Sequence, residues 1–173
     1  MIADQFVAEI EEEARTTRKF LERIPKDKLQ WRPHPKSMTA GQLAMHIAQS
    51  QGNIAQMAQV TEIDMPNFNR ENPQPKSVQE ILDAFEESTK TALEIVPTFS
   101  DEDMQETWST VADGRTIFSV PRSVMLRTIL CNHLYHHRGQ LGVYLRLMGC
   151  KVPSSYGPSG DELPDFMLEE ATA

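Results

Sequence analysis

The stretch PRSVMLRTILCNHLYHHRGQLGVYLRLM, residues 121–148, is the longest segment of the chain with a helical pattern. At a rise of about 1.5 Å per residue, a helix of about 28 residues would span about 42 Å. Gly149 follows it, at a position where glycine commonly ends a helix. We therefore predict one long helix here, against which shorter segments pack.

Three more segments carry apolar residues at helical spacing. They cover residues 3–24, 39–61 and 77–96. Pro25 and Pro97 follow the first and the third of them, and a residue before proline is biased away from helical angles. Capping-box patterns open the second segment at Thr39 and the third at Ser77. Four such helices predict an all-α fold, a four-helix bundle whose topology the long connections leave open.

A short β-hairpin is predicted before the last helix. Asp113 and Gly114 lie between two β-prone runs, residues 108–111 and 116–119. An Asp-Gly pair in this setting is a strong signal for a tight hairpin turn.

Length and composition narrow the class of protein. A chain of 173 residues is typical of one domain, and we predict a single domain over residues 1–173, with the bundle at about 3–149 and an ordered tail at 150–173. The chain has 17 basic and 25 acidic residues, a net charge of −8. It lacks both the basic cluster that nucleic-acid binding needs and the run of about 20 apolar residues that a membrane span needs.

The start of the chain has no secretory signal pattern. Cys131 and Cys150 are not in a CxxC pair, and two isolated thiols fit a reducing compartment. We therefore expect a cytoplasmic protein that binds neither nucleic acid nor membrane.

Two histidines of the long helix are candidate metal ligands. His133 and His137 are one turn apart, about 40° from each other at about 100° per residue. The same count places Leu126 and Tyr144 beside them, so we predict the pair in the middle of the buried stripe. Residues four apart on a helix can reach one metal ion, although such a pair alone is a weak motif.

His46 is the third candidate ligand. Its face of the second helix is half polar, with these neighbours: Thr39, Leu43, Ser50, Asn53 and Met57. A half-polar face suits a helix that lines a wet or metal-bearing cleft. Three histidines from two helices match the His₃ set of catalytic zinc sites, which keep one coordination position open.

Other candidates are weaker. Cys131 is about 160° from His133 around the helix, His136 is at the flank, and His34 is in a proline-rich loop. Residues 156–160, YGPSG, have turn composition. The chain has no HExxH, ExxH, GxSxG, GxGxxG or P-loop pattern, which argues against zincins, carboxylate di-iron bundles and nucleotide-binding folds.

Three motifs together resemble the DinB family. They are KSMTAGQLAMHIA at 36–48, NHLYHHRGQL at 132–141 and YGPSGDE at 156–162. The resemblance spans about residues 31–162. It implies a four-helix bundle of the DinB/YfiT-like type, usually dimeric, in which His46, His133 and His137 hold a divalent metal, commonly zinc or nickel. It also implies similarity to metal-dependent thiol transferases or thiol-dependent isomerases, and it does not imply DNA binding.

We therefore expect a metal-dependent enzyme that acts on a small thiol or another nucleophile, because a metal with an open coordination position lowers the pKa of a water or thiol bound there. A non-catalytic metal-holding or stress-response module is the first alternative, and an ordinary helical interaction domain is the second. Zinc or nickel is the expected metal, although three imidazoles also suit iron and copper. Ser50, Asn53 and Tyr144 are candidates for orienting the histidine rings, and no catalytic residue is assigned.

Overall fold

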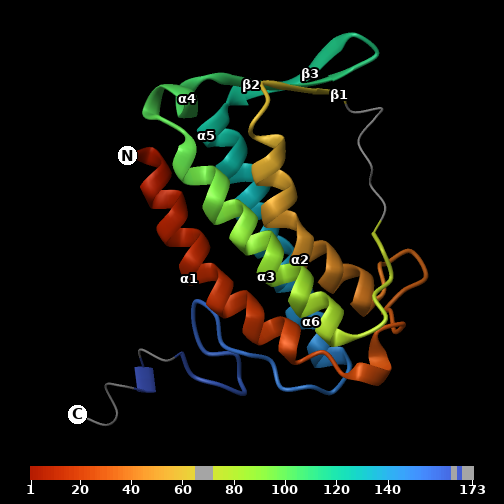
Figure 1. Cartoon of the computed structure of the whole chain (residues 1–173). Helices are drawn as coiled ribbons and strands as arrows, with labels where there is room; N and C mark the ends of the chain where they lie inside the picture. The colour runs from red at the N-terminus through yellow and green to blue at the C-terminus, as the bar shows by residue number, and fades with distance from the viewer. Residues whose placement is uncertain (65–71, 165–166, 169–173) are drawn as a thin grey trace.

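The computed structural model describes residues 1–64, 72–164 and 167–168 of the chain. Three long helices and a segmented rod pack side by side (Figure 1). The three helices are α1 (Ile2–Glu22), α2 (Ala40–Met57) and α3 (Val78–Ile95). The rod consists of α5 (Arg122–Met125), η4 (Leu126–Asn132) and α6 (His133–Leu147). Three short helical segments connect them: η1 (Lys26–Lys28), η3 (Val96–Thr98) and α4 (Asp101–Gln105).

The predicted helix starts at Thr39 and Ser77 are confirmed by their caps. Thr39 Oγ1 accepts a hydrogen bond from the Gln42 amide at 3.0 Å, and Gln42 Oε1 accepts one from the Thr39 amide at 3.0 Å. Ser77 Oγ accepts from the Glu80 amide at 3.1 Å. These bonds satisfy backbone N–H groups that the first turn of a helix leaves without partners.

A three-stranded sheet lies at one end of the helices (Figure 1). The predicted hairpin is confirmed as β2 (Thr107–Ala112) and β3 (Arg115–Pro121), with Asp113 and Gly114 at φ 50° and 71°. The third strand, β1 (Glu62–Asp64), pairs in parallel with β2 and was not predicted. With only three residues, β1 is too short to show an alternating pattern.

The all-α four-helix prediction is therefore confirmed only as a mostly helical fold with a small sheet. The second helix ends at Met57, because the chain turns there toward β1 instead of continuing to residue 61. The long last helix is not uniformly α-helical. Its η4 segment is a π-helix, in which each hydrogen bond encloses one residue more than in an α-helix.

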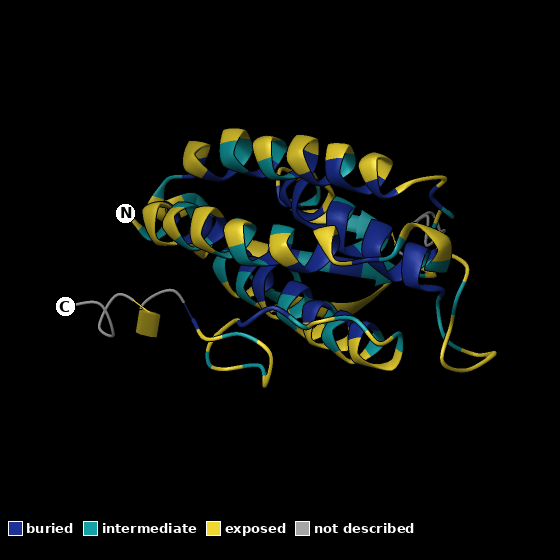
Figure 2. Cartoon of the chain, turned by 90° about the horizontal axis from the view of Figure 1, so that it is seen from below, coloured by how far each residue is buried: buried dark blue, intermediate teal, exposed yellow. Residues whose placement is uncertain are grey.

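Helices α1 and α3 bury one side and expose the other, whereas most residues of α2 are buried (Figure 2). The core has two parts. One is built mainly from α2, α3 and α6, and the other from the sheet end of the chain, where Trp108 is fully buried. The Trp108 indole N–H donates to the Met57 carbonyl at 3.2 Å, which ties β2 to the end of α2.

Residues 150–164 run along the end of the molecule opposite the sheet (Figure 1). Arg146 of α6 pairs with Asp161 at 2.7 Å, and Val152 N–H donates to the same carboxylate at 2.9 Å. The remainder of the predicted tail, 165–166 and 169–173, lies outside the described residues. Within the part of the chain that the structure describes, every helix is too short or too polar to cross a membrane.

Candidate metal centre

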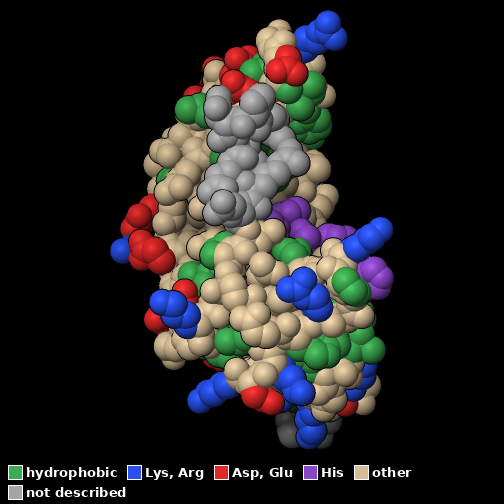
Figure 3. Space-filling model, turned by 90° about the vertical axis from the view of Figure 1, so that its right-hand side faces the viewer, with side chains coloured by type: hydrophobic (Ala, Val, Ile, Leu, Met, Phe, Trp, Pro, Cys, Tyr) green, Lys and Arg blue, Asp and Glu red, His purple; other side chains and the backbone are tan. Residues whose placement is uncertain are grey.

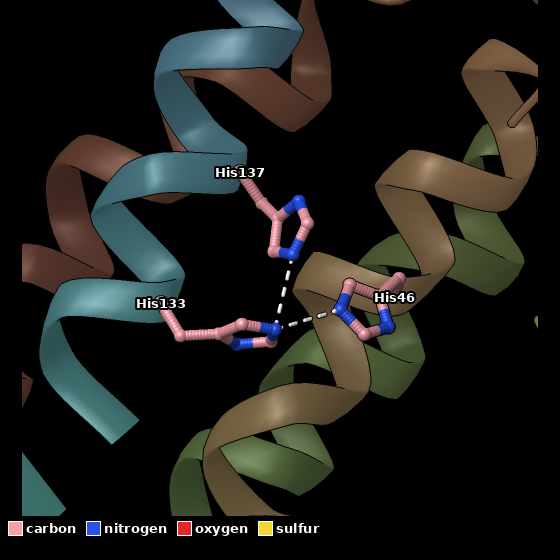
Figure 4. A group of neighbouring side chains, drawn as sticks. All are labelled: His46, His133 and His137. Atoms are coloured by element: carbon pink, nitrogen blue, oxygen red, sulfur yellow. Dashed lines mark hydrogen bonds between the residues drawn. The ribbon is translucent and has the colours of Figure 1, made fainter. Parts of the chain in front are cut away.

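The three predicted ligand histidines meet between α2 and α6 (Figure 4). His133 Nε2 lies 3.2 Å from His46 Nε2 and 3.0 Å from His137 Nε2. Two imidazole nitrogens at about 2.0–2.1 Å from one tetrahedral ion would be about 3.3 Å apart. The observed spacing therefore fits three nitrogens around a single cation.

Hydrogen bonding among the rings cannot satisfy this arrangement by itself. A neutral imidazole nitrogen carries at most one hydrogen, so His133 Nε2 can bond to only one of its two neighbours as a donor. Three Nε2 atoms directed at one point are instead the donor set that a divalent transition metal uses. The residues present thus fit a metal ion.

Two rigid helices position the three rings. His46 lies near the middle of α2, a helix without a single charged residue. His133 and His137 lie on successive turns of α6. All three side chains are partly buried, and histidine side chains reach the surface on the face shown in Figure 3. The centre is accordingly neutral, polar and close to the surface.

Burial lowers the pKa of each of the three histidines. It is the largest cause for His133, whose pKa falls to about 4, and the neighbouring histidines lower it further. For His46 a hydrogen bond with Asn72 partly offsets the effect of burial, and for His137 a bond with Gln140 does the same. Neutral imidazoles, which metal binding requires, are therefore the favoured state near pH 7.

Two side chains outside the triad orient its rings. Gln140 Oε1 lies 2.7 Å from His137 Nδ1, which places the proton on Nδ1 and leaves the Nε2 lone pair free. The Asn72 side chain bonds to His46. Gln42, which caps α2, also donates to the Asn72 carbonyl at 3.2 Å. The start of α2 thus helps to hold Asn72 beside the site.

These two partners were missed in the sequence. Gln140 could have been found, because it is three residues after His137 on the same helix. Asn72 could not, because its loop reaches α2 only through tertiary structure. The three residues suggested instead make other contacts: Ser50 donates to the Ile47 carbonyl, Tyr144 donates to the Met38 carbonyl, and Asn53 is exposed.

The predicted position of the histidines within the buried stripe is wrong. The buried residues of α6 are Leu134, Arg138, Leu141 and Leu145. Their stripe is centred about 110° from His133 around the helix. The histidines therefore lie at the edge of the buried face, where a ligand can reach them.

The weaker candidates stay outside the cluster. The His136 ring packs edge-on against His137 at 4.9 Å but is exposed. His34 Nδ1 accepts from the Lys36 amide at 3.1 Å in its loop. Cys131 is buried against the other part of the core, and burial raises its pKa to about 12. Among the described residues, the group that could hold a metal ion is His46, His133 and His137.

A helical scaffold with three convergent imidazoles defines the class, a helical protein with a candidate mononuclear metal centre. The model of the DinB family matches residues 1–165, and the chain therefore belongs to the DinB family.

The chain is also similar to individual proteins and solved structures. The protein YrdA of Bacillus subtilis (strain 168) is 29% identical over 167 residues, which cover 96% of this chain and 95% of YrdA. The crystal structure of a DinB-like protein from Bacillus cereus ATCC 10987 has a TM-score of 0.68 at 26% identity, over 88% of this chain and 97% of that one.

The DinB-like protein YjoA from Bacillus subtilis has a TM-score of 0.67 at 22% identity, over 87% of this chain and 96% of that one. At this identity, the likeness to YjoA supports the fold alone.

Proposed function

We propose that this protein binds a divalent metal ion through His46, His133 and His137 and uses it in a metal-dependent reaction of a small thiol or a similar nucleophile. The observation that carries the proposal is the convergence of three Nε2 atoms, two of them 3.0 and 3.2 Å from the third. Zinc or nickel is the proposed metal.

A divalent cation held by three imidazoles lowers the pKa of a water or thiol at its open position. The residues of the chain prepare the site for that chemistry. Burial keeps the three rings neutral. Gln140 and Asn72 hold two of the rings in orientation. A small-molecule substrate is proposed because the three histidines are only partly buried.

Elemental analysis of untagged protein is the first test. We expect about one zinc or nickel ion per chain, a stoichiometry that follows from one three-histidine site. A protein that contains no metal and takes up none on addition of zinc or nickel would contradict the proposal. The matched control is His34→Ala, since His34 lies in a loop outside the cluster.

The second test is catalysis. The zinc- or nickel-loaded protein is assayed for transfer of common cellular thiols to chlorinated aromatics and epoxides, with the His46→Ala variant as control. Metal-dependent turnover that the variant lacks would support an enzyme. Stoichiometric metal without turnover on these substrates, or on simple esters and amides, would favour a metal-holding module instead.

We also propose a homodimer in the cytoplasm, in line with the family resemblance. Light scattering of the purified protein tests the dimer, which predicts twice the mass of the 19.6 kDa chain.

A further inference from the structure

A second polar cluster joins α6 to α1. Glu9 and Glu13 lie one turn apart on α1, and Tyr135 and Arg138 lie one turn apart on α6. The Tyr135 hydroxyl donates to the Glu9 carboxylate, and the Arg138 guanidinium donates to the Glu13 carboxylate. We call these two contacts the α1–α6 ladder.

Arg138 is the more deeply buried member of the ladder. It is 2% exposed, and its Nη1 also donates to Thr17 Oγ1 at 3.1 Å. Its Nη2 donates to the Tyr156 hydroxyl at 2.7 Å. The guanidinium carbon lies 5.3 Å from the centre of the Tyr135 ring and 5.2 Å from that of Tyr156. Few positions of the side chain would preserve all of these contacts.

The other rung of the ladder is reinforced from η4. Arg127 bonds to both carboxylate oxygens of Glu9, at 2.6 and 2.7 Å. Glu9 thus accepts from Tyr135 and from Arg127 together, and the pKa of its carboxyl is lowered mainly by Arg127. Consequently α1 contacts the rod of α5, η4 and α6 on both sides of His133 in the sequence, through Arg127 before it and through Tyr135 and Arg138 after it.

Two rungs one turn apart determine how α6 lies along α1 and how it is rotated. Sliding or turning α6 would break both contacts at once, whereas a single contact would permit pivoting. At about 100° per residue, Arg138 is about 140° from His133 around the helix. The ladder therefore acts on α6 from the side opposite to α2 and His46.

Small rotations of α6 matter for the histidines. A side-chain tip about 6 Å from the helix axis moves about 2 Å for a rotation of about 20°. Metal–ligand distances have to be met within about 0.2 Å. Apolar contacts between leucines are non-directional and do not fix the rotation of a helix. Buried polar and ionic groups, by contrast, are best known for fixing the register of one helix against another.

We propose that the α1–α6 ladder, with Arg138 and Glu13 at its centre, is a positioning element that aligns His133 and His137 with His46 for metal binding. This inference rests on the proposed metal site. It assigns these residues no contact with metal or substrate; they act through the orientation of α6.

The test measures Co²⁺ affinity and the visible spectrum of the Co²⁺-loaded protein for wild type and for Arg138→Met. We expect Arg138→Met to bind Co²⁺ about 10–100-fold more weakly, as found when groups behind metal ligands are lost, and to show a shifted d–d band. Glu13→Gln removes only the charge of the partner and decides the question if Arg138→Met does not fold.

Arg122→Met is the matched control. Arg122 is 3% exposed and bonds to the Ala58 carbonyl, the Asp103 carbonyl and the Glu106 carboxylate. It precedes His133 by eleven residues. We expect it to lower the thermal unfolding temperature as Arg138→Met does, while Co²⁺ affinity stays within about twofold and the spectrum is unchanged.

The outcomes separate the two proposals. If wild type binds no Co²⁺, the proposed function fails, and the positioning role fails with it. If wild type binds Co²⁺ and the ladder variants keep its affinity and spectrum, only the positioning role is overturned. Equal losses in Arg122→Met and in the ladder variants would also overturn it, because general destabilisation would then explain the effect.

Discussion

Helix α6 carries polar side chains on two faces, and the two faces are paired in different ways. Toward α1, Arg138 and Tyr135 donate to carboxylates of the protein. Toward α2, three imidazole nitrogens meet one another, and His133 Nδ1 has no hydrogen-bond partner among the described residues. Both faces are polar, but only the first is satisfied from within the chain. Polar side chains within a helical core thus do not by themselves indicate a ligand site. They indicate one where their metal-ligating atoms converge and lack hydrogen-bond partners from the protein.

The largest effect is expected on the paired face. Glu13→Ala leaves the Arg138 guanidinium buried without its carboxylate, and breaking a buried ion pair costs about 3–5 kcal/mol. Chemical denaturation of the metal-free protein should show this loss in the free energy of unfolding. A loss below about 1 kcal/mol would show that the ion pair does not hold α6 to α1. Glu12→Ala is the control, since the Glu12 side chain is exposed.

The next effect is expected on the unpaired face. His133→Ala removes the nitrogen that lies near both other rings, and metal affinity should fall more than about 100-fold, because the loss of outer partners alone costs about 10–100-fold. Isothermal titration with zinc measures it. His136→Ala is the control, because it also removes one histidine ring from α6 but not a proposed ligand, and it should retain zinc binding. Equal losses of affinity in both variants would contradict the assigned ligand set.

A smaller effect is expected from the partner of His137. Gln140→Leu removes the oxygen that lies 2.7 Å from Nδ1 without a large change in volume. Zinc affinity should fall about 10-fold, at the lower end of the range for such partners, while thermal unfolding of the metal-free protein stays nearly unchanged. Unchanged affinity would show that packing alone orients this ring.

The smallest effect separates the two faces by pH. The lowered pKa of His133, about 4 against 6.5, means that the unfolded state binds a proton first as pH falls. The free energy of unfolding of the metal-free protein should therefore be full above about pH 6.5 and decline toward pH 4, by on the order of 1 kcal/mol after solvent screening. The pKa of Glu9 is also lowered, from 4.5. Glu9 therefore contributes its full stability above about pH 4.5, and this contribution is lost only as the pH falls below that value.

Denaturation curves of wild type and His133→Ala across pH 4 to 8 test this division. The variant should show a smaller decline below pH 6.5, because His46 and His137 still contribute to it, and should keep the acid transition of the carboxylates. An identical pH dependence in both proteins would show that the histidine face does not contribute.

The regular helices and the histidine triad could be predicted from the sequence. Periodic apolar residues and the caps at Thr39 and Ser77 indicate the helices, because these signals are local. The triad was predicted because His133 and His137 share one turn of a single helix and the face of His46 is half polar. The position of His133 relative to the buried face was predicted wrongly, because helical periodicity places residues relative to each other and does not say which neighbouring element covers them.

Features that depend on tertiary contacts could not be predicted. Strand β1 exists only through its pairing with β2. Asn72 reaches His46 from a loop, and Glu13 meets Arg138 across a separation of 125 residues. Neither contact has a local pattern. The π-helical turn of η4 could not be predicted either, since its residues fit an α-helix equally well by composition.

The π-helical turn has a consequence for how this protein family can change. Deleting one residue within 126–132 would leave a continuous helix, because an α-helix needs one residue fewer per hydrogen-bonded turn. The segments on either side would keep nearly the same rotation about the rod axis, because the wider π-turn already accommodates the extra residue. Single-residue changes in length at this turn would thus be absorbed locally, and the histidines of α6 would keep their direction toward α2.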